Sequence, residues 1–257
     1  MTSTTAAAAA RLGPLAAMLR AEIWTESLRS WRMPAFVVPT LMFPVGFYIL
    51  FALVLAPGAD APAYLLATFG IFASLGPGLF SFGAGLATER EQGWLDLKRV
   101  APVPASVIIA AKLGMCIAFT ALVLALLYPL AGQLGGVALS PAEWALLTVV
   151  HLVAVVPVAL LGLTLGLAMP SKAAVAVCNL VMLALAVMGG LWIPLSVFPD
   201  GFQAAAVVVP TWHLGQLALG AIGQASAWAP GLHVLAILIF SAAMAVLAAR
   251  GWARMTA

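Results

Sequence analysis

Six stretches of this chain are long enough and apolar enough to cross a lipid bilayer as helices. A hydrocarbon core about 30 Å thick requires about 20 residues of α-helix. Hydrophobic residues make up 65% of the sequence and charged residues 7%, whereas soluble domains carry about 25% charged residues. This composition argues against a soluble enzyme or a nucleic-acid-binding protein, excludes a disordered chain, and predicts an all-α polytopic membrane protein. The predicted spans are Pro34–Ala56, Ala63–Ala87, Val107–Leu130, Trp144–Met169, Lys172–Pro194 and Gly231–Ala249.

The basic residues fall in alternate connections between these spans. All 11 Lys and Arg residues lie before the first span, around the connection between the second and third, at the joint between the fourth and fifth, or after the sixth. The charged residues in the other three connections are all acidic: Asp60, Glu143 and Asp200. Because basic residues are retained on the cytoplasmic side, this pattern predicts six crossings with both termini in the cytoplasm. Residues 1–33 and 250–257 would then be cytoplasmic, and residues 34–249 would form the membrane domain.

The N-terminal stretch Arg20–Arg32 has the pattern of an amphipathic helix. At 100° per residue, two tryptophans share one side with apolar residues, and the charged residues occupy the other. Such a helix is typical of the inner membrane interface. It can serve only as an anchor or can also contact a partner protein. Its predicted interacting residues are Glu22, Trp24, Glu26, Arg29 and Trp31.

The connection after the second span is the most highly charged stretch of the chain. Gly93 interrupts the helix that leaves the span, and Pro102 and Pro104 prevent a second helix from continuing. Between them, alternating charges and an apolar side predict a short cytosolic helix within residues 89–105. This segment is either a docking surface for a partner protein or a solvated loop. Its candidate docking residues are Glu89, Arg90, Glu91, Gly93, Trp94, Leu95, Asp96, Lys98 and Arg99.

Residues 194–230 form a long outer segment with a single carboxylate, Asp200. Its apolar stretches Phe202–Val209 and Trp212–Ile222 are each too short to cross a bilayer, and Pro210 separates them. Short re-entrant helices in the outer leaflet are the prediction. Such broken backbone must be shielded by protein or line a water-filled cavity.

Catalytic and metal-binding motifs are missing from this sequence. No Lys follows a Gly, so a P-loop is absent and we expect neither ATP nor a metal on this chain. His151 is predicted to be a packing or hydrogen-bonding residue. Asn179, the one amide at membrane depth, can bond a neighbouring helix or face a pathway. The residues predicted to line a substrate pathway are Thr40, Phe43, Phe72, Ser81, Asn179 and Met182.

Two motifs resemble the permeases of ABC type-2 transporters. The segment Glu89–Leu97, followed by Ala101–Val103 and Lys112-Leu113, is similar to the segment that follows the second span in that family. The stretch Gly189–Leu195, with Pro210–His213, resembles the region between spans five and six. Trp94 and Pro104 depart from the family pattern, which has Thr and Ser at these positions.

The resemblance implies that this chain is the membrane subunit of an exporter. It would pair with a second permease, identical or closely related, and with two ATPase subunits that bind ATP and magnesium. Residues Glu89–Arg99 would be the coupling helix that transmits ATP-driven movement. The family also implies export across a cytoplasmic membrane, here that of a bacterium.

The walls of the predicted spans are poor in charge, so we expect a small hydrophobic or amphipathic, drug-like cargo rather than a strongly anionic one. A lipid or lipid-linked glycan is the alternative cargo. Two other classes of function stay open. An intramembrane enzyme would need a polar pair such as His151 and Asn179, and a membrane scaffold would need no ATPase.

Overall fold

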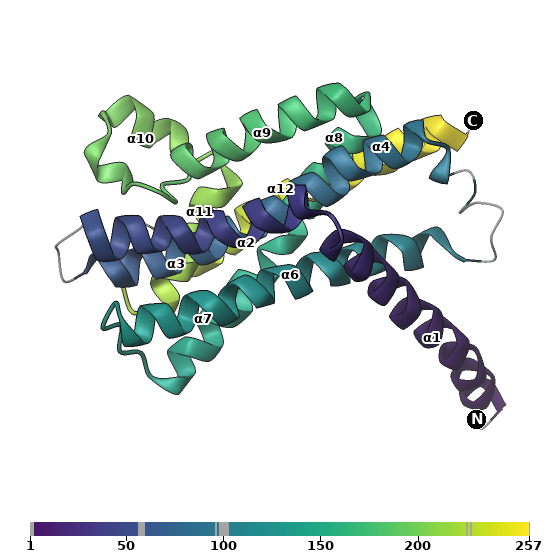
Figure 1. The fold of residues 1–257 in the computed structure, drawn as a ribbon, viewed down its shortest axis with the longest axis horizontal. Helices are drawn as coiled ribbons and strands as arrows, with labels where there is room; N and C mark the ends of the chain where they lie inside the picture. Colours follow the sequence, from purple (N-terminus) through teal and green to yellow (C-terminus); the bar gives the residue numbers. More distant parts are fainter. Residues whose placement is uncertain are drawn as a thin grey trace.

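The computed structural model describes residues 3–55, 60–95, 97, 103–224, 226 and 228–256, and in these residues it is all-helical. Six helices are long and apolar enough to span a membrane, which confirms the predicted number of spans. The chain starts with α1 (Ser3–Trp31), which leaves the helical bundle at an angle (Figure 1). The spans are Pro34–Leu55, Ala61–Glu91, Ala105–Gln133, Pro141–Ala168, Ser171–Met188 and Pro230–Arg254.

Several spans are built from more than one helical element. The first combines α2 (Pro34–Tyr48) and the π-helix η1 (Ile49–Leu55), and the third is α6 (Ala105–Gln133) alone. The second combines α3 (Ala61–Gly76), the π-helix η2 (Pro77–Gly85) and α4 (Leu86–Glu91). The fourth combines α7 (Pro141–Val153) and α8 (Val155–Ala168). The fifth is α9 (Ser171–Met188), and the sixth lies in α12 (Pro230–Thr256).

Prolines mark two of these internal changes. Pro77 is the first residue of η2, and the α7–α8 break at Ala154 lies three residues before Pro157. A proline has no N–H to donate to the preceding helical turn, and its ring crowds that turn. These two prolines therefore coincide with changes of helix geometry in the second and fourth spans.

The second span is the centre of the bundle. Most of its apolar stretch is buried, whereas little of α2, α9 or α12 is buried within the chain. Two glycines of α8 allow this helix to approach the second span closely: a Cβ at Gly162 would collide with the carbonyl oxygen of Gly78, and one at Gly166 with the carbonyls of Phe82 and Gly83. Gly162 and Gly166 are thus a close-packing pair, as the small-xxx-small spacing indicates.

The segment before the last span folds as short helices. η3 (Leu195–Val197), α10 (Asp200–Ala206) and α11 (Pro210–Ala221) follow α9. α10 and α11 meet at 89°, the geometry of a broken span or a re-entrant loop. Pro210 is the first residue of α11, which agrees with its predicted role as a separator.

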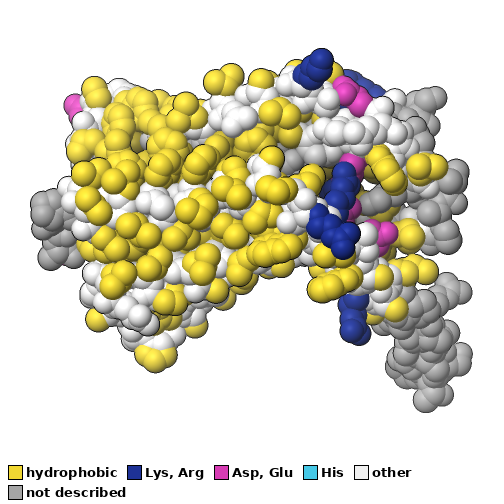
Figure 2. Space-filling view, in the orientation of Figure 1, with side chains coloured by type: hydrophobic (Ala, Val, Ile, Leu, Met, Phe, Trp, Pro, Cys, Tyr) yellow, Lys and Arg dark blue, Asp and Glu magenta, His cyan; other side chains and the backbone are white. Residues whose placement is uncertain are grey.

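The two ends of the molecule differ in charge. Figure 2 shows a face covered mainly by hydrophobic side chains, with the Lys, Arg and most acidic groups gathered near one end. Both chain termini lie at this end (Figure 1). We call it the basic end, and the topology predicted from the charges makes it the cytosolic one.

Candidate transport groove and coupling site

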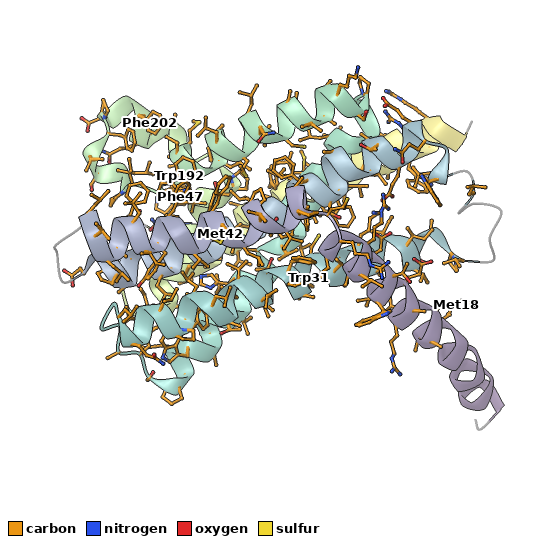
Figure 3. All side chains as sticks on the ribbon, viewed as in Figure 1. Met18, Trp31, Met42, Phe47, Trp192 and Phe202 are labelled. Atoms are coloured by element: carbon orange, nitrogen blue, oxygen red, sulfur yellow. The ribbon has the colours of Figure 1, made fainter. Side chains whose placement is uncertain are left out.

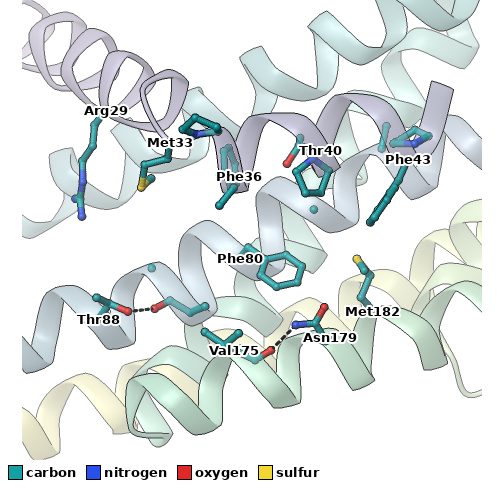
Figure 4. Close-up of a pocket in the computed structure, with 18 of the residues that line it drawn as sticks. Arg29, Met33, Phe36, Thr40, Phe43, Phe80, Thr88, Val175, Asn179 and Met182 are labelled. Atoms are coloured by element: carbon teal, nitrogen blue, oxygen red, sulfur yellow. Dashed lines mark hydrogen bonds between the residues drawn. The ribbon is translucent and has the colours of Figure 1, made fainter. Parts of the chain in front are cut away.

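An open groove runs along the first span between the second and fifth spans. Its volume is about 760 Å³, within the range of about 300–1,000 Å³ that is typical of small-molecule sites. Figure 4 shows α2 on one side and α9 on the other, with Phe80 between them. The lining side chains are mainly apolar and include Phe36, Pro39, Thr40, Phe43, Phe72, Phe80, Val175, Asn179 and Met182.

Five of the six residues predicted for a substrate pathway line this groove, and Ser81 does not. The second span contributes residues four apart, from Phe72 through Gly76 and Phe80 to Ala84 and Thr88. Side chains four apart share one helix face. Ser81, one residue beyond Phe80, turns away from that face and is buried. Ser81 therefore lies outside this groove.

Asn179 is exposed on the groove wall rather than bonded across helices. Its side-chain amide donates to the carbonyl of Val175, one turn earlier in α9, at 2.9 Å. This bond stays within α9 and does not reach a neighbouring helix. Of the two roles that the sequence leaves open for Asn179, the geometry favours a polar group in a pathway.

Four charged side chains, three of them buried, form an ion cluster at the basic end of the groove. Lys112 of α6 donates to Glu89 of α4 at 2.7 Å and to Glu26 of α1 at 3.2 Å. Arg29 of α1 donates to the same Glu89 oxygen at 2.5 Å. Glu26, Glu89 and Lys112 are each less than 5% exposed. Buried charges persist only when they are paired, so this cluster fixes α1 and α6 to the end of the second span.

The next two residues after Glu89 cap two other helices. Arg90 donates to the carbonyls of Leu167 and of Met169, the latter at 2.7 Å, at the C-terminus of α8. Glu91 accepts the backbone N–H of Ser171 at 2.8 Å and its hydroxyl at 2.5 Å, at the N-terminus of α9. A cation at a helix C-terminus and an anion at an N-terminus each satisfy free backbone groups and the helix dipole. Three successive residues therefore connect α4 to α1, α6, α8 and α9.

Comparison with known proteins agrees with this architecture. The family model described as "ABC-2 type transporter" matches residues 18–223. The chain belongs to this family. It is also 28% identical over 202 residues to the Bacillus subtilis (strain 168) protein named "Putative transport permease YvfS", with 77% of this chain and 82% of that protein covered. The protein is thus a permease subunit of an ABC transporter, a multi-pass membrane protein of a family that associates with an ABC ATPase.

In this ABC-2 permease, the amphipathic helix predicted at Arg20–Arg32 is longer than expected and begins at Ser3. The charged side of this helix packs against the helical bundle, because Glu26 is buried and Arg29 donates to Glu89. Its tryptophans are largely exposed: Trp24 is 70% exposed, and Trp31, whose ring centroid lies 6.1 Å from that of Phe119, is 54% exposed. The sequence shows two sides of this helix, but only the structure shows which side the bundle covers.

The permease turns sharply after Glu91. Gly93 has φ +74°, the left-handed conformation that ends many helices and that glycine adopts without steric cost. Beyond it, Leu95 is buried, while Trp94 and Leu97 are 52% and 60% exposed. The turn is therefore anchored by Leu95 and presents two apolar side chains. The predicted docking residues Asp96, Lys98 and Arg99 lie outside the described residues.

The histidines of the permease are hydrogen-bonded within the fold. The ring nitrogens of His151 contact the Tyr128 hydroxyl at 3.0 Å and the Ala67 carbonyl at 2.9 Å. His213 and His233, whose meeting the sequence does not indicate, lie 2.9 Å apart between their Nδ1 atoms and join α11 to α12. Within the described residues no three His, Cys, Asp or Glu side chains are placed to hold a metal ion.

Proposed function

We propose that this permease exports a small hydrophobic or amphipathic compound across a bacterial cytoplasmic membrane, and that the groove holds this cargo. The observation that carries the proposal is the groove itself, an apolar space of about 760 Å³ with Thr40 and Asn179 as its polar groups at mid-length. Sites for drug-sized ligands have such walls, in which a few polar groups fix orientation. The rival polar pair for an intramembrane enzyme is not assembled, since His151 is buried while Asn179 lies exposed in the groove.

The second permease would close the open side of the groove. α2 and α9 expose large apolar residues such as Met42, Phe43, Leu180 and Leu183 on the outside of the chain. Within a transporter, a second copy or a close relative would cover part of this surface and share the cavity. Two ATPase subunits, with their ATP and magnesium, would bind at the basic end.

The contacts at Glu89, Arg90 and Glu91 support a mechanism for coupling. An ATPase that grips Trp94 and Leu97 would move α4, and the ion cluster would carry this movement to α1, which leads into α2. The Glu91–Ser171 contact would carry it to α9. Because α2 and α9 are opposite walls of the groove, such a movement would change the width of the groove. ATP shifts this equilibrium only if the ATPase binds one groove conformation better than the other.

Substitutions in the groove test the cargo proposal. We expect Asn179→Leu and Phe43→Ala to reduce substrate-stimulated ATP hydrolysis and uptake into inverted vesicles by about tenfold, because they remove a polar anchor and an aromatic wall. The control is Leu238→Ala, which is 60% exposed on α12 and lies outside the groove lining.

Equal transport by the groove variants and the control would contradict the proposal. The compounds tested also decide between cargo classes. Selective loss of lipid or lipid-linked glycan transport, with drug-like amphiphiles unaffected, would favour the alternative cargo.

Substitutions at the turn test the coupling mechanism. We expect Glu91→Ala to abolish most of the substrate stimulation of ATP hydrolysis while the ATPase still co-purifies, because α9 loses its N-terminal contact. Gly93→Val should also weaken co-purification, since a β-branched residue at φ +74° costs on the order of 1–2 kcal/mol and shifts Trp94. Gly136→Val is the control, because Gly136 has φ +65° in a different connection. Unchanged stimulation in Glu91→Ala and Gly93→Val would refute the coupling role.

A further inference from the structure

The two ends of the transport groove differ in charge. Figure 4 shows Arg29 and Thr88 at one end, and Phe43 and Met182 toward the other. Among the described residues, the only charged side chains in the lining are Arg29 and Arg32, both at the basic end, and none of the lining residues is a carboxylate. The apolar end continues into an aromatic group in which Phe72 contacts Trp192 at 5.5 Å and Phe47 contacts Trp192 at 5.7 Å between ring centroids (Figure 3).

The ion cluster leaves the positive charge of Arg32 at the basic end without a counter-charge. Glu26 and Glu89 balance Arg29 and Lys112, so the cluster has no net charge. Arg32 is exposed, lies one turn after Arg29, and has no ion-pair partner among the described residues. An arginine retains its charge at any physiological pH and presents donors in a planar fork that fits a carboxylate or a phosphate. One fixed, unpaired cation therefore stands at the entrance of an apolar groove.

We infer that the groove selects an amphipathic anion, with its acidic head on Arg32 and its apolar body along α2 toward Phe43. This inference rests on the proposed function and narrows its cargo. From Met33 to Pro44 the groove follows eleven residue steps of helix, about 16 Å at 1.5 Å per residue. A carboxylate, sulfonate or phosphate ester on an apolar body of about this length fits both ends. A cationic amphiphile meets Arg32 with like charge and finds no acidic group among the described residues of the lining.

The charge-poor walls still argue against a compact, strongly anionic cargo, as the sequence predicts. The structure adds that the one charged end is basic. The sequence does not reveal this, because Arg29 and Arg32 precede the first span and read as part of an anchoring helix. They reach the groove only because α1 turns at Met33 and leads directly into its wall.

The test measures how the wild-type permease and an Arg32→Gln variant, each in phosphatidylcholine nanodiscs, bind three probes with one alkyl chain. The probes are a dansyl-labelled fatty acid, its primary amide and its trimethylammonium analogue, with binding followed by energy transfer from tryptophan. We expect the wild type to bind the acid about tenfold more tightly than the amide, the strength of a charge-assisted hydrogen bond, and the cation most weakly. Arg32→Gln should reduce this preference to about twofold and leave the affinity for the amide unchanged.

The control is Arg20→Gln, which removes an exposed arginine of α1 outside the groove lining and should leave the preference intact. Equal affinities for acid and amide in the wild type, or an unchanged preference in Arg32→Gln, would overturn the inference. If Asn179→Leu weakens binding of the amide, but the wild type binds the acid no more tightly than the amide, the proposed function stands and the selectivity for anions is refuted. Failure of all three probes to bind would count against both.

The acidic head can belong to a free compound or to a membrane lipid, and competition separates these sources. If phosphatidylglycerol in the nanodisc displaces the acid probe from the wild type, a lipid occupies the site. If a soluble short-chain fatty acid displaces it and phosphatidylglycerol does not, a free amphiphile does. Either result supports anion recognition at Arg32, and displacement that is equally strong in Arg32→Gln would contradict it.

Discussion

Replacing Lys112 with methionine should lower the melting temperature of the purified permease by on the order of 10 °C. Methionine keeps the length and volume of the side chain but leaves Glu26 and Glu89 buried without their shared cation. Breaking a buried ion pair by removing one partner costs about 3–5 kcal/mol, and for a chain of this size each kcal/mol corresponds to about 2–4 °C. Fluorescence-detected thermal unfolding in detergent measures the change.

The control for this prediction is Lys172→Met, because Lys172 is exposed at the start of α9. It should change the melting temperature by no more than about 2 °C, the typical effect of an exposed charge. The double variant Lys112→Met with Glu26→Gln should recover part of the loss, since it leaves Arg29 and Glu89 as a balanced pair. A Lys112→Met protein as stable as the wild type would show that the cluster is not a structural element.

Adding a methyl group at Gly162 or Gly166 should strongly reduce the yield of folded permease. In both positions the new Cβ would collide with backbone carbonyls of η2, and backbone cannot move aside as a flexible side chain can. Overpacking of a core costs about 1–3 kcal/mol or more, so we expect each Gly→Ala variant to lose several degrees of melting temperature. The double variant should aggregate on extraction, as measured by size-exclusion chromatography.

Gly220→Ala is the matched control for the glycine variants. Gly220 lies in helix α11, where a Cβ has no heavy atom within 4 Å. Alanine is the better helix former by about 1 kcal/mol, so this variant should be neutral or slightly stabilised. If Gly162→Ala and Gly166→Ala behave like Gly220→Ala, then α8 and η2 do not pack as closely as the structure shows.

The number of spans and their approximate limits were predictable from the sequence. Apolar runs of about 20 residues have few alternatives to a membrane-spanning helix, because lipid offers no partner for free backbone groups. The turn at Gly93 and the separation of α10 from α11 at Pro210 were predictable for a similarly local reason. Each depends on the conformational preference of one residue.

The partners of individual charges were not predictable in this way. In the sequence, Lys112 belongs to the basic residues around the connection between the second and third spans. In the structure it is buried in α6 and pairs with Glu26 and Glu89, which are 86 and 23 positions away. Glu26 lies on the charged side of a two-sided helix, and nothing in the sequence shows that this side is covered. That Phe80 lines the groove and Ser81 does not was also not predictable, because neighbouring residues of one helix face different directions and only the packing of the helices shows which face is open.

The sequence by itself determined that this is a six-span helical membrane protein of the ABC-2 permease type. Hydrophobic length and local motifs depend on residues close together in the chain. Only the tertiary structure decided that Glu89, Arg90 and Glu91 connect to four different helices, and that Arg29 and Arg32 stand at one end of an apolar groove. These relations depend on distances between residues far apart in sequence, which are fixed when helices pack.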